Sequence, residues 1–382
     1  MRCGVPHCWL VVPLAAAILY GGTPALASEA ATSSRAPPPP ALRAPSPLLP
    51  GSATPDAEFE NPHIALLLPL NSDAFGRHAE AVKNGFLAAA KVQGRAPLPL
   101  RIYAVGDDAR HSVEAYRHAL STGARLVVGP LTRDGVTAIA DGPVPVPTLA
   151  LNVPESSARL PVNLYILSLQ AEAEARQVAR LAHQEGRRNA LTVNGETPLM
   201  KRIHQAFVEE FTRLGGAHVM EFAFTSDPAG LARLKQAAGL ELADMAFLAL
   251  DFPRARLARP YLDPLALYAT SQVHPGNVGP LAGFDLAGVR FLDMPWLLQP
   301  DHPAVMVYPR PDYRDAVVLD RFYALGIDAF RVAQALLAGK PETTLDGVTG
   351  RLRLGRDHHF ARTLTAAQFN QGKLAVSVEV RP

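Results

Sequence analysis

The first clear pattern in the chain is an alternation of apolar runs with amphipathic segments that begins at residue 64. Residues 64–68 (IALLL) are all apolar, which is typical of a parallel strand covered on both faces. Pro69 ends this strand, because proline cannot donate to a sheet ladder. A polar loop follows, and apolar residues then recur at three- and four-residue steps over 79–90. The pattern predicts a buried strand, a loop and a helix, the first half of a βαβ unit.

The same alternation continues through the next part of the chain. Strands are predicted over 98–105, 125–128 and 148–151, and helices around 113–120 and over 134–140. Strands that alternate with helices in this way predict a doubly wound parallel sheet.

A second run of the same kind follows a strand at 164–169 that is expected to lead away from the first sheet. Helices are predicted over 171–185, 199–214, 229–238 and 255–262, and strands over 190–193, 219–224, 245–250 and 266–270. The fold class is therefore α/β, with two doubly wound parallel-sheet lobes and a cleft between them. Ligands of open α/β sheets bind at the carboxyl ends of the strands, so the loops at those ends are expected to line the cleft.

Polar and turn-forming residues in those loops are the candidate cleft and ligand-binding residues. They are Ser72, Phe75, Gly129, Pro130, Thr132, Asn152, Asn194 and Asp251.

The last part of the chain combines one long helix with short strands. The helix, predicted over 314–337, has a long apolar stripe and must pack on an existing sheet, that of the first lobe. The segments 347–354 and 375–380 predict a small antiparallel ribbon at the edge of the second lobe. Lobe 1 is thus predicted to comprise 62–168 and 290–338, and lobe 2 to comprise 169–289 and 339–382.

The beginning of the chain is predicted to lie outside both lobes. Residues 1–27 combine Arg2, an apolar run over 9–20 and a small-x-small end at 25–27, which predicts a cleaved secretory signal. An uncleaved membrane anchor is the alternative, although the apolar run is short for a span. Residues 28–61 are rich in Pro, Ala and Ser and predict a disordered linker.

Composition narrows the classes of partner and of reaction. The net charge of +2, without a basic stripe, argues against nucleic acid as a partner. Both cysteines, Cys3 and Cys8, lie in the predicted signal, so the rest of the chain has neither disulfides nor thiolate ligands. The sequence contains no phosphate-binding glycine loop, no H-E-x-x-H, no G-x-S-x-G, no S-x-x-K and no K-T-G. Neither an enzyme nor a bound metal or cofactor is predicted.

Two further segments carry residues that can form a site, Trp296 with its neighbours and the run 357–359. Trp296, in the run DMPWLL, is either a core anchor, which is the default for such a residue, or an exposed contact. Trp296 and Asp293 are the candidate partner contacts, because aromatic anchors dominate protein interfaces. The run 357–359 (DHH) does not predict a metal site, because adjacent side chains of an extended chain point to opposite faces.

Six stretches together resemble a known family, the penicillin-binding protein activators or LppC-like proteins of Gram-negative bacteria. They are GPLTRDGV (129–136), PTLALN (147–152), ATS (269–271), GFDLAGVRFLDMPWLL (283–298), FYALGIDAFRVAQ (322–334) and LDGVTGRLRL (345–354). The resemblance covers about residues 62–372. It implies a type 1 periplasmic-binding-protein fold and a non-catalytic periplasmic regulator that binds and activates a bifunctional peptidoglycan synthase.

Two features differ from that family, whose members carry a lipid-modified cysteine and an amino-terminal helical-repeat domain. Here no cysteine follows the signal, so association with the outer membrane is left open, and a Pro-rich linker precedes the lobes. The fold's other known use, carriage of an amino acid or short peptide, is the alternative function. Thr132 and Ser156 would supply hydroxyl groups for it, but Arg133 and Asp134 replace the small hydroxylated residues expected there. A closed cleft without a ligand is a third alternative.

Overall fold

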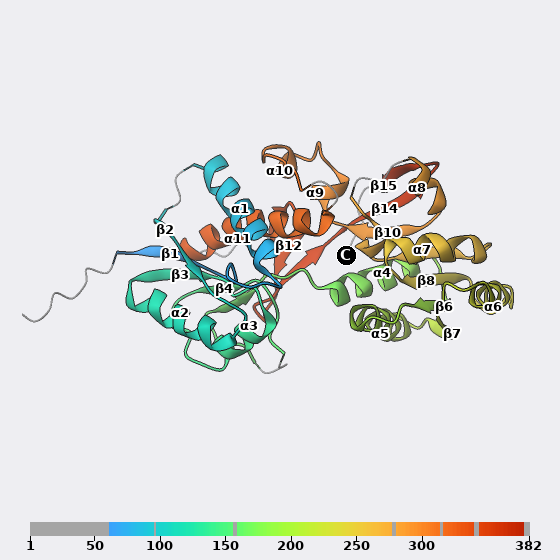
Figure 1. Cartoon of the computed structure of the whole chain (residues 1–382), viewed down its shortest axis with the longest axis horizontal. Coiled ribbons are helices and arrows are strands. Elements are labelled where there is room, and N and C mark those ends of the chain that lie inside the picture. Colours follow the sequence, from blue (N-terminus) through green and yellow to red (C-terminus); the bar gives the residue numbers. More distant parts are fainter. Residues whose placement is uncertain are drawn as a thin grey trace, which may run out of the picture. The chain divides into compact units, whose positions relative to one another are not determined.

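A computed structural model describes residues 61–94, 97–155, 159–276, 280–313, 316–339 and 344–377. All of them belong to one compact unit, Asp56–Pro382 (Figure 1). The predicted signal and all of the predicted linker except residue 61 lie outside the described residues. Within the described ranges, no helix is long and apolar enough to cross a membrane.

The first sheet has five parallel strands in the order β2-β1-β3-β4-β5. Its strands are β1 (His63–Leu68), β2 (Leu100–Ala104), β3 (Ala124–Val128), β4 (Thr148–Ala150) and β5 (Leu164–Ile166). Its helices are α1 (Gly76–Val92), α2 (Ala109–Ser121) and α3 (Arg133–Ala140). Every residue of β1 is buried, as an unbroken apolar run predicts for a central strand. The predicted doubly wound sheet is confirmed, but β5 pairs with β4 and completes this sheet instead of leading away from it.

The second sheet has seven strands in the order β15-β14-β10-β9-β8-β6-β7. They are β6 (Asn189–Asn194), β7 (Ala217–Ala223), β8 (Met245–Ala249), β9 (Ala266–Ala269), β10 (Arg290–Asp293), β14 (Thr365–Asn370) and β15 (Lys373–Ser377). The accompanying helices are α4 (Ala171–Gln184), α5 (Pro198–Arg213), α6 (Pro228–Ala238), α7 (Phe252–Ala258) and α8 (Pro280–Asp285). Two parallel α/β lobes are thus confirmed as the fold class.

Strand β10 corrects the predicted boundary between the lobes. Residues 290–338 were assigned to lobe 1, yet β10 pairs in parallel with β9 and antiparallel with β14 in the second sheet. The reason is packing, because Phe291 is fully buried and stacks on Phe369 of β14 with ring centroids 5.0 Å apart. Residues 290–293 therefore belong to the second sheet.

The segments of the predicted ribbon near the end of the chain belong to two different sheets. The β14–β15 hairpin extends the second sheet, whereas three other strands form an antiparallel sheet of their own. These strands are β11 (Thr344–Gly347), β12 (Gly350–Leu354) and β13 (Phe360–Thr363). Residues 378–380 of the predicted ribbon lie outside the described residues.

Three helices lie between β10 and β11 in the chain. They are α9 (Pro295–Leu298), α10 (Pro303–Met306) and α11 (Val317–Leu337). Helix α11 packs along α1, so its apolar stripe covers the first lobe as predicted (Figure 1).

The α1–α11 crossing is close enough to require glycine on both helices. A Cβ added to Gly326 would lie 2.0 Å from the carbonyl oxygen of Val82, and one added to Gly85 would lie 1.9 Å from the α11 backbone. Beside the crossing, the rings of Phe86 and Phe330 meet edge to face at 5.1 Å. The two helices therefore touch backbone to backbone.

Candidate functional site

Most predicted cleft residues use their side chains in local contacts. Ser72 Oγ accepts a hydrogen bond from the backbone N–H of Phe75 at 2.8 Å, and Thr132 caps the first turn of α3. Asn152 Nδ2 donates to the carbonyl oxygen of Leu131 at 2.9 Å. These are turn and N-cap roles, which Ser, Thr and Asn often have after a strand.

The remaining predicted cleft residues also have local structural roles, except Asp251. Gly129 has φ 108°, and a Cβ there would lie 2.0 Å from the carbonyl oxygen of Leu67, so only glycine fits. Pro130 next to it is buried, and Asn194 donates to Glu221 Oε1 at 2.6 Å. Of the eight predicted residues, Asp251 alone lines the pocket described next.

That pocket, with a volume of about 630 Å³, lies at the carboxyl ends of β8, β9 and β10. Its walls also include the first turns of α4, α7 and α11 and residues 360–362 of β13. Most of the lining is apolar, as at Leu169, Phe252, Met294, Val318 and Phe322. An apolar concavity with a few polar groups is typical of a small-molecule site.

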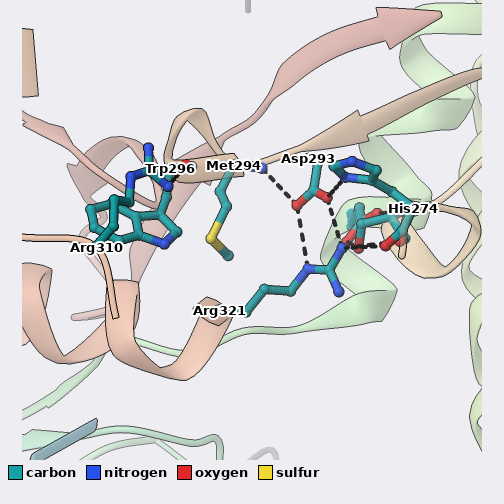
Figure 2. A network of polar contacts seen from close by, with 8 residues as sticks. His274, Asp293, Met294, Trp296, Arg310 and Arg321 are labelled. Atoms are coloured by element: carbon teal, nitrogen blue, oxygen red, sulfur yellow. Dashed lines mark hydrogen bonds and ion pairs between the residues drawn. The ribbon is translucent and has the colours of Figure 1, made fainter. Parts of the chain in front are cut away.

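A buried ion pair between Asp293 and Arg321 forms one wall of the pocket. Arg321 Nη2 lies 2.7 Å from Asp293 Oδ2 and also donates to the carbonyl oxygens of Ser271 and His274 at 3.1 and 3.2 Å. The ring Nδ1 of His274 lies 2.8 Å from the same carboxylate (Figure 2). Burial alone would raise the pKa of Asp293, but the charge of Arg321 and the His274 hydrogen bond hold it below its ordinary value. The pair joins β10 of the second sheet to α11.

Glu174, in the first turn of α4, is a second buried acid in the pocket wall. Its carboxylate accepts hydrogen bonds from the backbone N–H of Ser271 and, at 3.1 Å, from the Ser271 hydroxyl. Burial, followed by repulsion from the charge of Asp293, raises the pKa of Glu174 to about 7. Glu174 therefore carries a proton at the acidic end of the physiological range.

Arg362, on β13, is a cation of the pocket wall without a matching acid. Its Nη2 donates to the carbonyl oxygen of Ser168, and its buried Nε has no acceptor. Within the described ranges, no carboxylate forms a salt bridge with Arg362. Burial lowers the pKa of Arg362, and the charges of Asp328, Glu174 and Asp293 counteract this lowering only in part.

Trp296 and Asp293 are both buried, and this corrects their predicted role as exposed partner contacts. Trp296 is 0% and Asp293 is 2% exposed. The guanidinium of Arg310 lies 3.8 Å from the Trp296 ring centroid (Figure 2). The indole Nε1 donates to Asp320 at 3.4 Å. A side chain without accessible surface cannot touch a partner, so the core reading of Trp296 is confirmed.

Asp328 holds the turn between β11 and β12 against α11. Its carboxylate is 0% exposed and accepts hydrogen bonds from the backbone N–H of Val348 at 3.0 Å and of Thr349 at 2.8 Å. The Thr349 hydroxyl adds a third at 2.6 Å, and a Cβ on Gly347 would lie 2.6 Å from the carboxylate. The LGIDA and DGVTG stretches are therefore two sides of one buried contact.

Of the other candidates from the sequence, the run 357–359 reaches this pocket wall through His359. Ser156 lies outside the described residues. His358 stacks on Tyr165, and Asp357 accepts a hydrogen bond from the backbone of His359. Across the described part of the chain, no three metal-binding side chains come together.

The sequence analysis missed Glu174, Arg321 and Arg362, because a single charged residue in a helix or strand is normally expected to face solvent. One signal did exist on α11. Arg321 follows Val318 by three residues and precedes Leu325 by four, so it interrupts the apolar stripe at helical spacing. A charge on a buried face needs a buried partner, and here that partner is Asp293.

The raised pKa of Glu174 predicts a pH-dependent effect of Glu174→Gln. We expect the variant to match the natural protein near pH 5 and to exceed its free energy of unfolding by roughly 3 kcal/mol at pH 8. The ordinary pKa is 4.5 and the folded value about 7, so the folded state binds the proton more tightly. That stabilisation is complete below pH 4.5 and is lost as the pH rises through 7, whereas glutamine stays neutral.

Urea unfolding of both proteins at pH 5 and pH 8 measures this difference. The exposed Glu209, replaced by glutamine, is the matched control and should give the natural pH profile. Parallel profiles for the natural protein and Glu174→Gln would contradict the raised pKa.

The chain is similar to proteins of known families. The family model described as "LppC putative lipoprotein" matches residues 57–251 and 249–372. The penicillin-binding protein activator LpoA of Pectobacterium parmentieri is 28% identical over 328 residues, which cover 72% of this chain and 48% of the relative. LpoA of Klebsiella pneumoniae is 29% identical over 294 residues, with 67% and 42% covered. The chain spans about half the length of the curated relatives it matches.

Solved structures give a similar result. A Chromobacterium violaceum protein described as "a putative branched-chain amino acid ABC transporter" is 42% identical, with a TM-score of 0.69. The match covers 80% of this chain and 99% of that one. Full-length LpoA from Haemophilus influenzae is 22% identical, with a TM-score of 0.71 and 82% and 58% covered. At that identity the likeness to the Haemophilus protein shows the fold alone.

Proposed function

Because the chain belongs to the LppC family, we propose that it is a non-catalytic periplasmic regulator that binds and activates a bifunctional peptidoglycan synthase, a penicillin-binding protein. The observation that carries this proposal is the family match over residues 57–372 together with relatives named penicillin-binding protein activators. The absence of S-x-x-K and K-T-G from the sequence favours a regulator over a crosslinking enzyme.

Three stretches that resemble the family have structural roles around α11. Asp293 of DMPWLL pairs with Arg321, and Asp328 of LGIDA accepts hydrogen bonds from the backbone of DGVTG. These contacts fix α11 relative to β10 and to the β11–β12 turn. In a protein that works by contact, such residues preserve the shape of the surface that a partner recognises.

The test is the crosslinking rate of the organism's own bifunctional synthase, measured with and without the purified protein. Several-fold stimulation at micromolar concentration is expected. Heat-unfolded protein and a synthase inactivated by a β-lactam are the two controls, and neither should give stimulated crosslinking. An unchanged rate with protein shown to be folded by circular dichroism would overturn the proposal.

A second function, carriage of a small solute, is favoured by the pocket of about 630 Å³ at the strand ends. The 42% identical Chromobacterium protein, described as a branched-chain amino acid transporter component, points the same way. A ligand of this kind would raise the melting temperature by mass action. This function does not exclude the first, because it uses the pocket and not the outer surface.

A further inference from the structure

Within the described structure, Glu174 and Arg362 are the charged groups of the pocket wall that form no ion pair, and Glu174 is held by hydrogen bonds from Ser271. Asp251 pairs with Arg254, and Asp293 pairs with Arg321. Arg362 has only the carbonyl oxygen of Ser168, and its Nε N–H is buried without an acceptor in the described structure. A buried guanidinium without a carboxylate is costly, and an anion supplied from outside the chain would remove that cost.

Two long helices begin at the same pocket without side-chain caps. Gln170 and Ala316 are the N-cap residues of α4 and α11, and neither makes a side-chain cap bond. Ala171 and Val317, the first helical residues, both line the pocket. The positive end of each helix dipole favours a negative charge nearby.

Acids in those first turns are already engaged. On α4, Glu172 bonds with Arg202 at 2.8 Å and Glu174 accepts from Ser271. On α11, Asp320 accepts from the Trp296 indole. None of these three carboxylates forms a salt bridge with Arg362. Asp328, Glu174 and Asp293 therefore offset the charge of Arg362 only in part, because none of them forms a salt bridge with it in the described part of the chain.

The other walls of the pocket are apolar and favour a ligand with an apolar hydrocarbon part. Leu169, Leu199, Phe252, Val318 and Phe322 supply hydrocarbon and aromatic surface around the cavity. An amino acid would need an acid for its ammonium group, but Asp251 and Asp293 already pair with arginines and Glu174 is held by Ser271. A simple carboxylate needs no such acid.

We propose that this pocket binds a small apolar monocarboxylate, with the carboxylate on Arg362 and the apolar body against Phe252, Val318 and Phe322. The inference deepens the second proposed function, carriage of a solute, and does not depend on activation of the synthase. A bidentate guanidinium–carboxylate pair fits the geometry of arginine and satisfies the orphan Nε.

Three probes that share one carbon skeleton test the charge requirement. They are 4-methylpentanoate, its amide and leucine, which are titrated into the full protein by calorimetry, with melting temperatures measured in parallel. We expect 4-methylpentanoate to bind and to raise the melting temperature, and the amide and leucine to bind at least about tenfold more weakly. Equal binding of acid and amide, leucine binding as tightly as the acid, or no binding of the acid at millimolar concentration would overturn the proposal.

Arg362→Gln tests the residue itself, with Arg180→Gln, whose ion pair with Glu210 lies outside the pocket, as the matched control. Arg362→Gln should lower the affinity for 4-methylpentanoate roughly tenfold or more, and Arg180→Gln should leave it unchanged. A folded Arg362→Gln variant that binds the acid normally would overturn the assignment. If that variant fails to fold, the comparison of acid with amide in the natural protein decides. The synthase assay is run separately, so failure of either proposal is recognised independently.

Discussion

Trp296→Ala is expected to lower the free energy of unfolding by roughly 3–5 kcal/mol, because a fully buried indole is removed and a cavity is left. The variant loses the packing of Trp296 on Arg310 and on Tyr323, whose ring centroid lies 5.5 Å away. It also loses the indole donor to Asp320. Urea unfolding followed by circular dichroism measures the loss.

Trp296→Phe separates packing from the hydrogen bond. It keeps an aromatic ring but no N–H, so a loss of about 1–2 kcal/mol is expected. A Trp296→Ala variant with natural stability that no longer stimulates the synthase would contradict the buried role and restore the contact hypothesis. Stimulation must therefore be compared at equal concentrations of folded protein.

Asp328→Ala is expected to cost a similar amount, roughly 3–5 kcal/mol. Without the carboxylate, the backbone N–H groups of Val348 and Thr349 are buried without an acceptor, at about 1–3 kcal/mol each. The Thr349 hydroxyl loses its acceptor as well. Unfolding by urea and by heat should both report the loss.

A double-mutant cycle with Thr349→Val isolates the hydroxyl bond. That single change should cost only about 1 kcal/mol, and its effect should largely vanish when Asp328 is already alanine. Asp328→Asn keeps one acceptor oxygen and should fall between the natural protein and alanine. If Asp328→Ala were no more destabilising than Thr349→Val, the two backbone bonds would not hold the turn.

The sequence predicted the parallel lobes well because their strands are unbroken apolar runs. Residues 64–68 and 245–250 can only be central strands, and both are buried as expected. Strand β10 was missed because it has four residues and ends in a charged one, Asp293. Its pairing with β14 joins segments about seventy positions apart, and no local pattern encodes such a partner.

The pocket was predicted less well than the fold, for a chemical reason. Ser, Thr, Asn and Asp after a strand serve equally as ligand-binding groups and as caps, and Ser72 and Thr132 turned out to have local roles. The charges that do line the pocket come from helix and strand positions such as Arg321 and Arg362. Only the interruption of the α11 stripe by Arg321 and Asp328 pointed to buried charges in advance.

The glycine crossing of α1 and α11 also sets the order in which the chain can fold. Gly85 lies against the backbone of Tyr323, 238 positions away (323 − 85), and Phe86 packs on Phe330. The side of α1 that packs on α11 stays uncovered until α11 has formed. All five strands of the first sheet, in contrast, precede residue 167. Contacts of such long sequence separation slow folding, so an intermediate with the α1 face uncovered is expected to limit its rate.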